Sequence, residues 1–265
     1  MIAAFAPAAL ALGSGAAIGV VLALIGGGGS ILAVPLLVYL VGMPSTHAAV
    51  GTAALAVAAN ASVSLGLHAR RTRIHWPCAA VFSIAGVGGA LLGAAVGKAT
   101  DGQQLLALFG LVMVLVGALM LRSKRAGGDD VWLTRDSAPR LVPRLVGLGA
   151  GVGMLSGFFG IGGGFLIVPG LMMATGMSLA AATSASLVAV TAFGLASASS
   201  YAWSGLIDWP VAGLLIAGGV AGAVLGARAN AVLASRKTIL TRLFAGFVIA
   251  AGLYVSVRGV LTLYG

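Results

Sequence analysis

Charged residues make up only 8% of this 265-residue sequence, and glutamate is absent. Hydrophobic residues account for 60% of it, and the mean hydropathy is +1.12. A soluble globular domain of this size carries far more charge on its surface. The composition therefore excludes a soluble protein. It predicts an all-α polytopic membrane protein, because a helix satisfies its own backbone polar groups in lipid.

Carboxylates are missing from the middle of every apolar run, since the five acidic residues are all aspartates in or near polar connections. This absence excludes the mid-membrane Asp or Glu with which many transporters relay protons. The single cysteine, Cys78, excludes an internal disulfide. The glycine runs also lack the Lys-Ser/Thr of a phosphate-binding loop, so we expect no ATP hydrolysis. We also expect no cofactor and no metal site.

Basic residues are absent before Arg70, so the N-terminal apolar segment lacks the basic start of a signal peptide. We expect it to be a retained membrane helix. The net charge of +10 comes from Lys and Arg in the connections between apolar runs, as cytoplasmic loops require. The basic charge therefore indicates membrane topology and not nucleic-acid binding.

Glycine is abundant, with 42 residues, and its densest runs recur at a fixed offset of 134. LALIGGGGSILAVPLLVYLVGM at 22–43 and SGFFGIGGGFLIVPGLMMATGM at 156–177 share a Gly-rich run, Val-Pro and a final Gly-Met. Further along, GVGGALLGA matches GVAGAVLGA. We therefore predict two homologous membrane repeats, at 1–121 and 142–265, joined by a polar linker at 122–141.

Each repeat contains five apolar segments, which predicts about 8 to 10 membrane segments in all. They lie at 7–25, 30–42, 47–69, 77–97 and 103–121 in the first repeat, and at 142–159, 164–176, 179–203, 210–227 and 239–262 in the second. The second segment of each repeat has about 13 residues, too few to cross a hydrocarbon core of about 30 Å. We expect Gly-broken helices there, each followed by a half-helix or a re-entrant arm.

The charge pattern indicates that the repeats are inverted relative to each other. If each repeat crosses the membrane an odd number of times, all of the 15 Lys and Arg except Lys98 and Arg258 lie on one side. A parallel arrangement separates the charges less completely. The positive-inside rule therefore places the linker in the cytoplasm and both termini outside.

Other glycines recur at every fourth residue, which is typical of closely packed membrane helices. They are Gly89, Gly93, Gly97, Gly149, Gly153, Gly157, Gly218, Gly222 and Gly226. We assign them to helix packing. Trp76, Trp203 and Trp209 are expected at the membrane interfaces, where tryptophan is enriched.

The two glycine runs, 26–29 and 160–164, interrupt helices in the membrane, where each unpaired backbone group costs several kcal/mol. A bound ligand offsets that cost. The half-helix after each run begins with free N–H groups and the positive end of its dipole, which attracts an anion without a charged side chain. Inverted repeats with broken helices are typical of secondary transporters, whose substrate binds where the breaks meet.

Hydroxyl and amide donors at the start of the third segment of each repeat suit the oxygens of sulfite or a sulfonate, although such groups in membrane helices often bond only a backbone carbonyl. The predicted substrate-binding residues are Gly26, Gly27, Gly28, Gly29, Ser30, Thr52, Asn60, Gly160, Gly162, Gly163, Gly164, Thr183 and Ser184. Pro35 and Pro169 are assigned structural roles. His47 and His68 are candidate proton carriers, or interfacial residues without a role in transport.

These features together resemble the sulfite exporter TauE/SafE family. The resemblance rests on the Gly-rich break followed by Val-Pro and Gly-Met in both repeats, on the helix openings Gly51-Thr52 and Thr183-Ser184, and on the late GALLGA and GAVLGA motifs. It covers almost the whole chain. It implies a multi-pass permease of the inner (plasma) membrane that is linked to the export of sulfite or organosulfonates.

The sequence thus predicts a secondary transporter, and not an enzyme, that exports a small sulfur-containing anion by alternating access. One alternative is a metal-cation or other small-solute permease, suggested by Met172, Met173 and Met177. Another is an intramembrane serine protease with Ser14 or Ser156 as the nucleophile, but the serine needs a nearby histidine, and the second repeat contains none. The expected partners are a small anionic substrate and the lipid bilayer.

Overall fold

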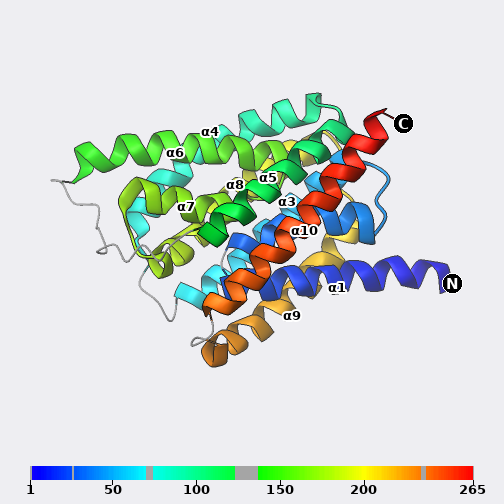
Figure 1. Cartoon of the computed structure of the whole chain (residues 1–265), viewed down its shortest axis with the longest axis horizontal. Helices are drawn as coiled ribbons and strands as arrows, with labels where there is room; N and C mark the ends of the chain where they lie inside the picture. The colour runs from blue at the N-terminus through cyan, green and yellow to red at the C-terminus, as the bar shows by residue number, and fades with distance from the viewer. Residues whose placement is uncertain (1, 26, 70–73, 123–136, 234–236, 265) are drawn as a thin grey trace.

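Helices form most of the computed structural model, which describes residues 2–25, 27–69, 74–122, 137–233 and 237–264 (Figure 1). Seven of these helices are long and apolar enough to cross a membrane. Shorter apolar helices lie at Gly29–Leu40, Gly164–Thr175 and Ala245–Gly259. The predicted all-α polytopic architecture is confirmed.

All ten apolar segments predicted from the sequence coincide with helical residues. The first half of the chain contains α1 (Ile2–Ile25), η1 (Gly27–Leu32), α2 (Ala33–Pro35), η2 (Leu36–Leu40), α3 (Thr46–Ala69), α4 (Trp76–Ala99) and α5 (Gly102–Arg122). The second half contains α6 (Ala138–Phe159), α7 (Gly164–Thr175), α8 (Leu179–Trp203), α9 (Trp209–Leu233) and α10 (Lys237–Tyr264). The division into repeats stays a prediction, and most of the linker lies outside the described residues.

Two helix pairs, α4 with α6 and α1 with α9, pack along faces of glycine. A Cβ atom on Gly153 would collide with the carbonyl oxygen of Gly86, and one on Gly222 would collide with that of Ala16. The missing side chains therefore let the backbones touch. The role in helix packing predicted from the four-residue glycine spacing is confirmed.

α3 and α8 form the centre of the bundle, since 67% of each span is buried, against 33 to 39% of the other five candidate spans. Lys98, in the last turn of α4, donates from Nζ to the carbonyl oxygen of Ser200 near the end of α8 (3.1 Å). At the same end of the molecule, the hydroxyl of Thr52 near the start of α3 accepts from the Asp208 N–H just before α9 (3.0 Å). α3 and α8 are therefore antiparallel.

These contacts define two ends of the bundle. We name the end with Lys98, Thr52 and Asp208 the Lys98 end, and the opposite end, where α4 begins, the linker end. Trp203 and Trp209 flank the turn at the Lys98 end and are 95% and 64% exposed, and Trp76 at the linker end is 53% exposed. Inverted repeats require antiparallel α3 and α8. The inversion of the repeats itself stays a prediction.

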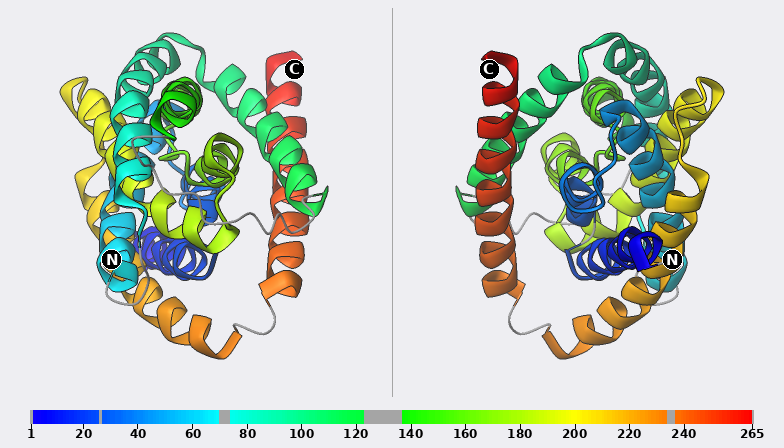
Figure 2. Two further views of the ribbon diagram at one scale, coloured as in Figure 1. Left: turned by 90° about the vertical axis from the view of Figure 1, so that its left-hand side faces the viewer. Right: turned by 90° about the vertical axis from the view of Figure 1, so that its right-hand side faces the viewer.

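α5 and α10 pair with each other along one side of the bundle (Figure 2). Two aromatic contacts connect this pair to the short segments. Phe109 of α5 lies against Phe159 at the end of α6, and Tyr254 of α10 lies against Tyr39 of η2, each with 5.4 Å between ring centroids. The α5–α10 pair therefore covers both broken segments from one side.

Candidate functional site

The second glycine run forms a sharp turn between α6 and α7. α6 ends at Phe159, and Gly163 is the N-cap residue of α7, which begins at Gly164. Gly160, Gly162 and Gly163 have φ angles of +63°, +64° and +63°, a region that residues with a side chain rarely adopt. Glycine therefore supplies the backbone conformation that this break requires.

The same turn brings other atoms so close that a side chain has no room. A Cβ atom on Gly163 would lie 2.6 Å from the Cβ of Ser156, and one on Gly160 would lie 2.8 Å from the carbonyl oxygen of Val50. Both distances are shorter than a carbon atom in a folded protein tolerates. Only glycine satisfies both the dihedral angle and the contact distance here.

The second break begins near the Lys98 end and reaches mid-height of the bundle. The Cβ position of Gly162 is 3.0 Å from Val57, near the middle of α3, and 3.2 Å from Val190, near the middle of α8. α7 then runs back beside α6, where the Cβ position of Gly170 is 3.3 Å from Val152. With only 12 residues, α7 is a re-entrant half-helix and not a span.

The first glycine run does not form the same turn. Gly26 lies outside the described residues, and η1, which opens with Gly27, Gly28 and Gly29, is a 3-10 helix. One α-helical turn and the π-helix η2 follow it. Of the two forms expected for 30–42, the arm is thus not one regular half-helix, because it combines 3-10, α and π turns. Pro35, which has no N–H to donate, lies where the α-helical turn changes to the π-helix.

Close packing explains a glycine in this first arm. The Cβ position of Gly29 lies 2.6 Å from the backbone nitrogen of Leu22 and 2.9 Å from the carbonyl oxygen of Ile18, both in α1. The arm therefore folds back onto α1, as α7 folds back onto α6. The re-entrant form that the sequence also allowed is the observed one. Ser30, the next residue, is fully buried.

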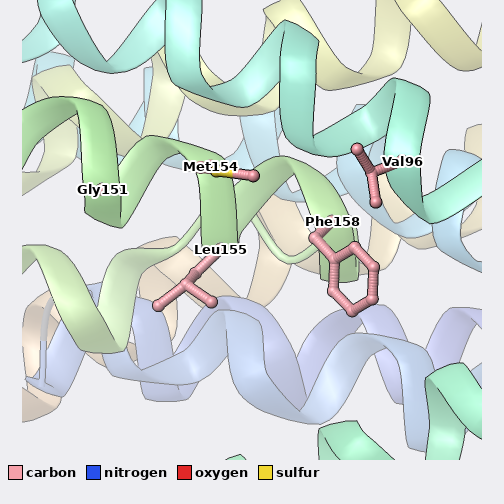
Figure 3. Close-up of a pocket in the computed structure, with 5 residues that line it drawn as sticks. All are labelled: Val96, Gly151, Met154, Leu155 and Phe158. Atoms are coloured by element: carbon pink, nitrogen blue, oxygen red, sulfur yellow. The ribbon is translucent and has the colours of Figure 1, made fainter.

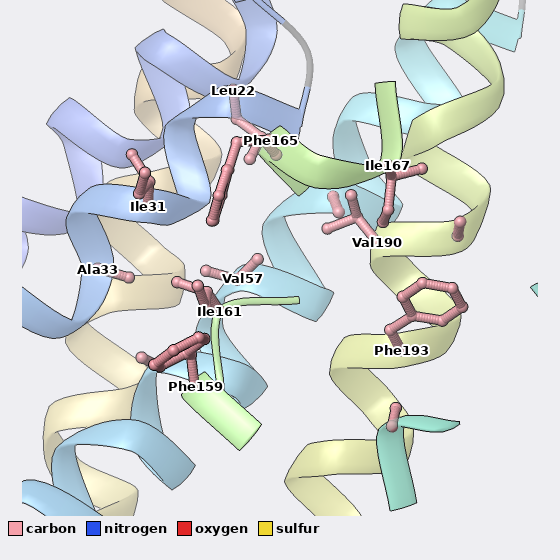
Figure 4. Close-up of a cluster of buried hydrophobic side chains, with 14 of the residues drawn as sticks. Leu22, Ile31, Ala33, Val57, Phe159, Ile161, Phe165, Ile167, Val190 and Phe193 are labelled. Carbon is pink, nitrogen blue, oxygen red and sulfur yellow. The ribbon is translucent and has the colours of Figure 1, made fainter. Parts of the chain in front are cut away.

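The two broken segments meet inside the bundle, because α7 packs directly against η1. Figure 4 shows the side chains around this junction, among them Leu22, Ile31, Ile161 and Phe165. These side chains are apolar and buried. Polar contacts for a ligand at the junction therefore come from backbone groups and from a few buried hydroxyls.

The start of α7 supplies such backbone groups. The N–H groups of Leu166 and Ile167 both donate to the carbonyl oxygen of Gly163 (2.9 Å each), and no side chain caps the helix. Gly164 and Phe165 therefore have N–H groups without a backbone acceptor in the described part of the chain. These groups lie at the positive end of the helix dipole, in apolar surroundings that strengthen electrostatic attraction.

Two of the predicted donors face α9. The hydroxyl of Thr52 accepts the hydrogen bond from Asp208 described above. Nδ2 of Asn60 donates to the carbonyl oxygen of Leu215 (3.5 Å), and a Cβ on Gly219 would collide with the Asn60 amide. The structure thus gives both side chains contacts between helices.

Thr183 and Ser184 lie in the second turn of α8, on the linker side of the break. Ser184 is buried, Thr183 is half-buried, and the carbonyl oxygen of Thr183 accepts from the Ser186 hydroxyl (2.8 Å). Val190, which faces the glycine turn, follows six residues after Ser184. Both residues are therefore one to two helical turns from the height of the break.

The two candidate proton carriers lie at opposite ends of α3. Nε2–H of His47 donates to the carbonyl oxygen of Thr100 (3.0 Å) at the Lys98 end. Nδ1–H of His68 donates to the carbonyl oxygen of Ser64 (2.9 Å) near the linker end. The structure does not bring these side chains together, and their role in proton transfer stays a prediction.

The methionines that suggested a cation permease do not converge. Met173 is 72% exposed, whereas Met177 is fully buried. Within the described ranges, no three His, Cys, Asp or Glu side chains lie together as a metal site requires.

An apolar hollow of about 250 Å³ lies between α4 and α6 (Figure 3). Its lining residues are Val96, Gly151, Met154, Leu155 and Phe158. Met154 and Leu155 are exposed on the outer face of the bundle, which lipid covers in a membrane protein. This hollow has no polar side chain with which to bind an anion.

Ser156 also lies at the second break. Ser156 is fully buried, touches the Cβ position of Gly163, and was considered only as a protease nucleophile. Its place in the sequence indicated that it lies near the break, because Ser156 is the first residue of the second glycine-rich segment. Its side-chain direction, however, depends on the turn that brings Gly163 back to α6.

Residues 11–255 match the family model described as sulfite exporter TauE/SafE. The chain belongs to this family. It is also similar to a probable membrane transporter protein of Xylella fastidiosa, with 43% identity over 244 residues that cover 92% of this chain and 93% of the relative. The predicted family is confirmed.

Two more distant relatives of this TauE/SafE protein have similar names. A probable membrane transporter protein of Methanocaldococcus jannaschii is 32% identical over 162 residues, 59% of this chain and 58% of the relative. The probable membrane transporter protein YunE of Bacillus subtilis is 30% identical over 173 residues, 58% of this chain and 63% of the relative. No solved structure matches the chain. The family and the relatives identify a membrane transporter.

Proposed function

We propose that this TauE/SafE protein exports a small sulfur-containing anion, such as sulfite or a sulfonate, as a secondary transporter. The observation that carries the proposal is the meeting of the two glycine-rich segments inside the bundle, where α7 packs on η1. Broken helices that meet at the midplane are the usual binding site of secondary transporters. In the inner membrane, the linker then lies in the cytoplasm and both termini lie outside.

The sign of the substrate charge follows from the groups at this junction. Free N–H groups and the positive end of the α7 dipole favour an anion. The apolar side chains around them exclude water and so strengthen the interaction. A cation at this point requires carboxylates or converging soft ligands, and the surrounding cluster is apolar.

Energetics permit export without ATP. A membrane potential that is negative inside drives a monoanion outward with about 2.3 kcal/mol per 100 mV. That free energy corresponds to roughly 50-fold accumulation outside. Alternating access then requires one part of the bundle to move against the other, and the α5–α10 pair is the suitable part because it contacts the broken segments through the two aromatic pairs.

The test is sulfite flux from proteoliposomes under a K⁺-diffusion potential. We expect potential-driven efflux from the wild type and at least a tenfold lower rate with Gly163→Ala, because the added Cβ collides with Ser156 and strains a positive φ angle. Thiosulfate, taurine and sulfoacetate are tested in parallel. One of these anions should be preferred over the others.

The matched control is Gly176→Ala. Gly176 also has a positive φ angle, +73°, at the other end of α7, but its Cβ position is open. This variant has similar backbone strain without a collision, so its flux should stay within about threefold of the wild type. If folded wild-type protein moves none of the four anions, the proposal is wrong, and metal cations and other small solutes are tested next.

A further inference from the structure

Ser156 lies in the last turn of α6, and its hydroxyl lies at the glycine turn that leads into α7. Ser156 is fully buried, and its Oγ has no hydrogen-bond partner among the residues that the structure describes. Its carbonyl oxygen accepts from the Ile161 N–H (3.3 Å), so its backbone belongs to the glycine turn itself. The side chain is therefore held at the break with an unused donor.

Serine and threonine in membrane helices usually donate to the carbonyl oxygen four residues earlier. Three residues of this protein do so at 2.8 Å: Ser62 bonds Ala58, Thr175 bonds Leu171, and Thr191 bonds Leu187. Ser156 has no such bond. A buried hydroxyl without a partner is unfavourable, and a ligand that accepts its hydrogen bond removes that penalty.

The hydroxyl faces the start of α7. The Cβ position of Gly163, the N-cap residue, lies 2.8 Å from Oγ of Ser156. The N–H groups of Gly164 and Phe165 follow directly and have no backbone acceptor in the described ranges. Three hydrogen-bond donors, one hydroxyl and two amides, thus lie at the same turn.

The first repeat has an equivalent contact between a glycine and the preceding helix, but without a hydroxyl group. Gly29 packs against Leu22 just as Gly163 packs against Ser156, and both pairs are seven residues apart at the offset of 134. Leucine therefore occupies the place of the serine. η1, moreover, is a six-residue 3-10 helix, whereas α7 is a regular helix of 12 residues. The two breaks are unequal as binding sites.

We propose that Ser156 is a substrate-binding residue, and that the second break alone holds the anionic group of the substrate. The Ser156 hydroxyl and the first N–H groups of α7 donate to its sulfur-bound oxygens. The first break contributes apolar contact through Leu22 and Ile31. This inference rests on the proposed function. It makes the site one-sided, in the sense that only the second break donates hydrogen bonds to the anionic group.

The experiment compares Ser156→Ala with Ser83→Ala in the full-length protein. Ser83 is a matched control, because it is also a buried helical serine whose Oγ has no partner. The sulfite concentration that gives half-maximal potential-driven flux should rise at least tenfold with Ser156→Ala. It should change less than twofold with Ser83→Ala. A third variant, Leu22→Ser, adds a hydroxyl at the first break and should not lower the half-saturating concentration of sulfite, because η1 is a short 3-10 helix without the free N–H groups of α7.

Thermal unfolding in detergent separates binding from structure. Without ligand, Ser156→Ala should melt no lower than the wild type, because the substitution removes an unpaired buried hydroxyl. The increase in melting temperature that sulfite causes in the wild type should be lost in this variant. A second measurement uses Ser156→Cys in a Cys78→Ala background, where sulfoacetate should slow alkylation by N-ethylmaleimide.

The outcomes distinguish this inference from the proposed function. If wild-type protein transports sulfite and Ser156→Ala keeps its half-saturating concentration, the role of Ser156 is wrong and the exporter proposal stands. If Leu22→Ser tightens sulfite binding more than tenfold, the one-sided site is wrong. If wild-type protein transports no sulfur anion, both proposals fail together.

Discussion

Thr52 is a residue whose hydroxyl has a structural partner far away in the chain. It is fully buried near the start of α3, where its Oγ accepts the hydrogen bond from the Asp208 N–H. This bond connects the central helix of one half to the turn before α9. The position of Thr52 next to Gly51 suggested a substrate ligand, but its partner lies 156 residues later.

Thr52→Val should lower the free energy of unfolding by about 1 kcal/mol, because the Asp208 N–H loses its acceptor. Thr52→Ser keeps the hydroxyl and should stay close to the wild type. Unfolding midpoints in detergent measure both effects. Unchanged stability of Thr52→Val together with weaker sulfite binding would instead indicate that the hydroxyl serves the substrate.

At the scale of an element, two neighbouring glycines of α6 have very different surroundings. Gly153 faces α4, and its Cβ position collides with Gly86. Gly151, two residues earlier, has nothing within 4 Å of its Cβ position. A helix packed on one face has contacts at one glycine and open space at the other, because successive residues point about 100° apart.

Gly153→Ala should destabilise the protein by about 1–3 kcal/mol, since the added methyl group forces α4 and α6 apart. Gly151→Ala should stabilise it by up to about 1 kcal/mol, since alanine favours the helix and meets no neighbour. Melting temperatures of the two variants should therefore change in opposite directions. A stable Gly153→Ala variant would contradict the tight α4–α6 contact.

At the scale of the whole molecule, the two ends differ in charge. Lys98 at the Lys98 end bonds Ser200 and the hydroxyl of Ser204 (3.1 and 2.9 Å), and its Nζ lies 5.8 Å from the centre of the Tyr201 ring. Near the linker end, Arg140 and Arg144 lie in the first two turns of α6, and Arg228 lies near the end of α9. The positive-inside rule therefore predicts that the Lys98 end faces outward.

Cysteine labelling tests this orientation. Cys78 is buried, so the native protein should react little with a membrane-impermeant maleimide. Ser45→Cys, at an exposed position of the Lys98 end, should be labelled in intact cells. Ser137→Cys, at the linker end, should be labelled only after permeabilisation. The reverse pattern would show that the orientation is wrong.

The sequence by itself determined the membrane class, the ten helical segments and the glycine packing faces. Lipid imposes these features locally, because an apolar segment needs a certain length to cross and must pair its own backbone groups. The positive φ angles at Gly160 and Gly163 were also predictable, since a turn in an apolar run needs residues without a side chain.

Only the tertiary structure decided how the two glycine runs differ and which donors face the junction. Pro35 and Pro169 occupy equivalent positions, yet η1 and η2 are irregular and α7 is a regular helix. Neighbouring helices therefore decide the form of each arm. Hydrogen-bond partners likewise depend on contacts between distant segments, so neither the bond from Asp208 to Thr52 nor the unpaired hydroxyl of Ser156 could be predicted from the sequence.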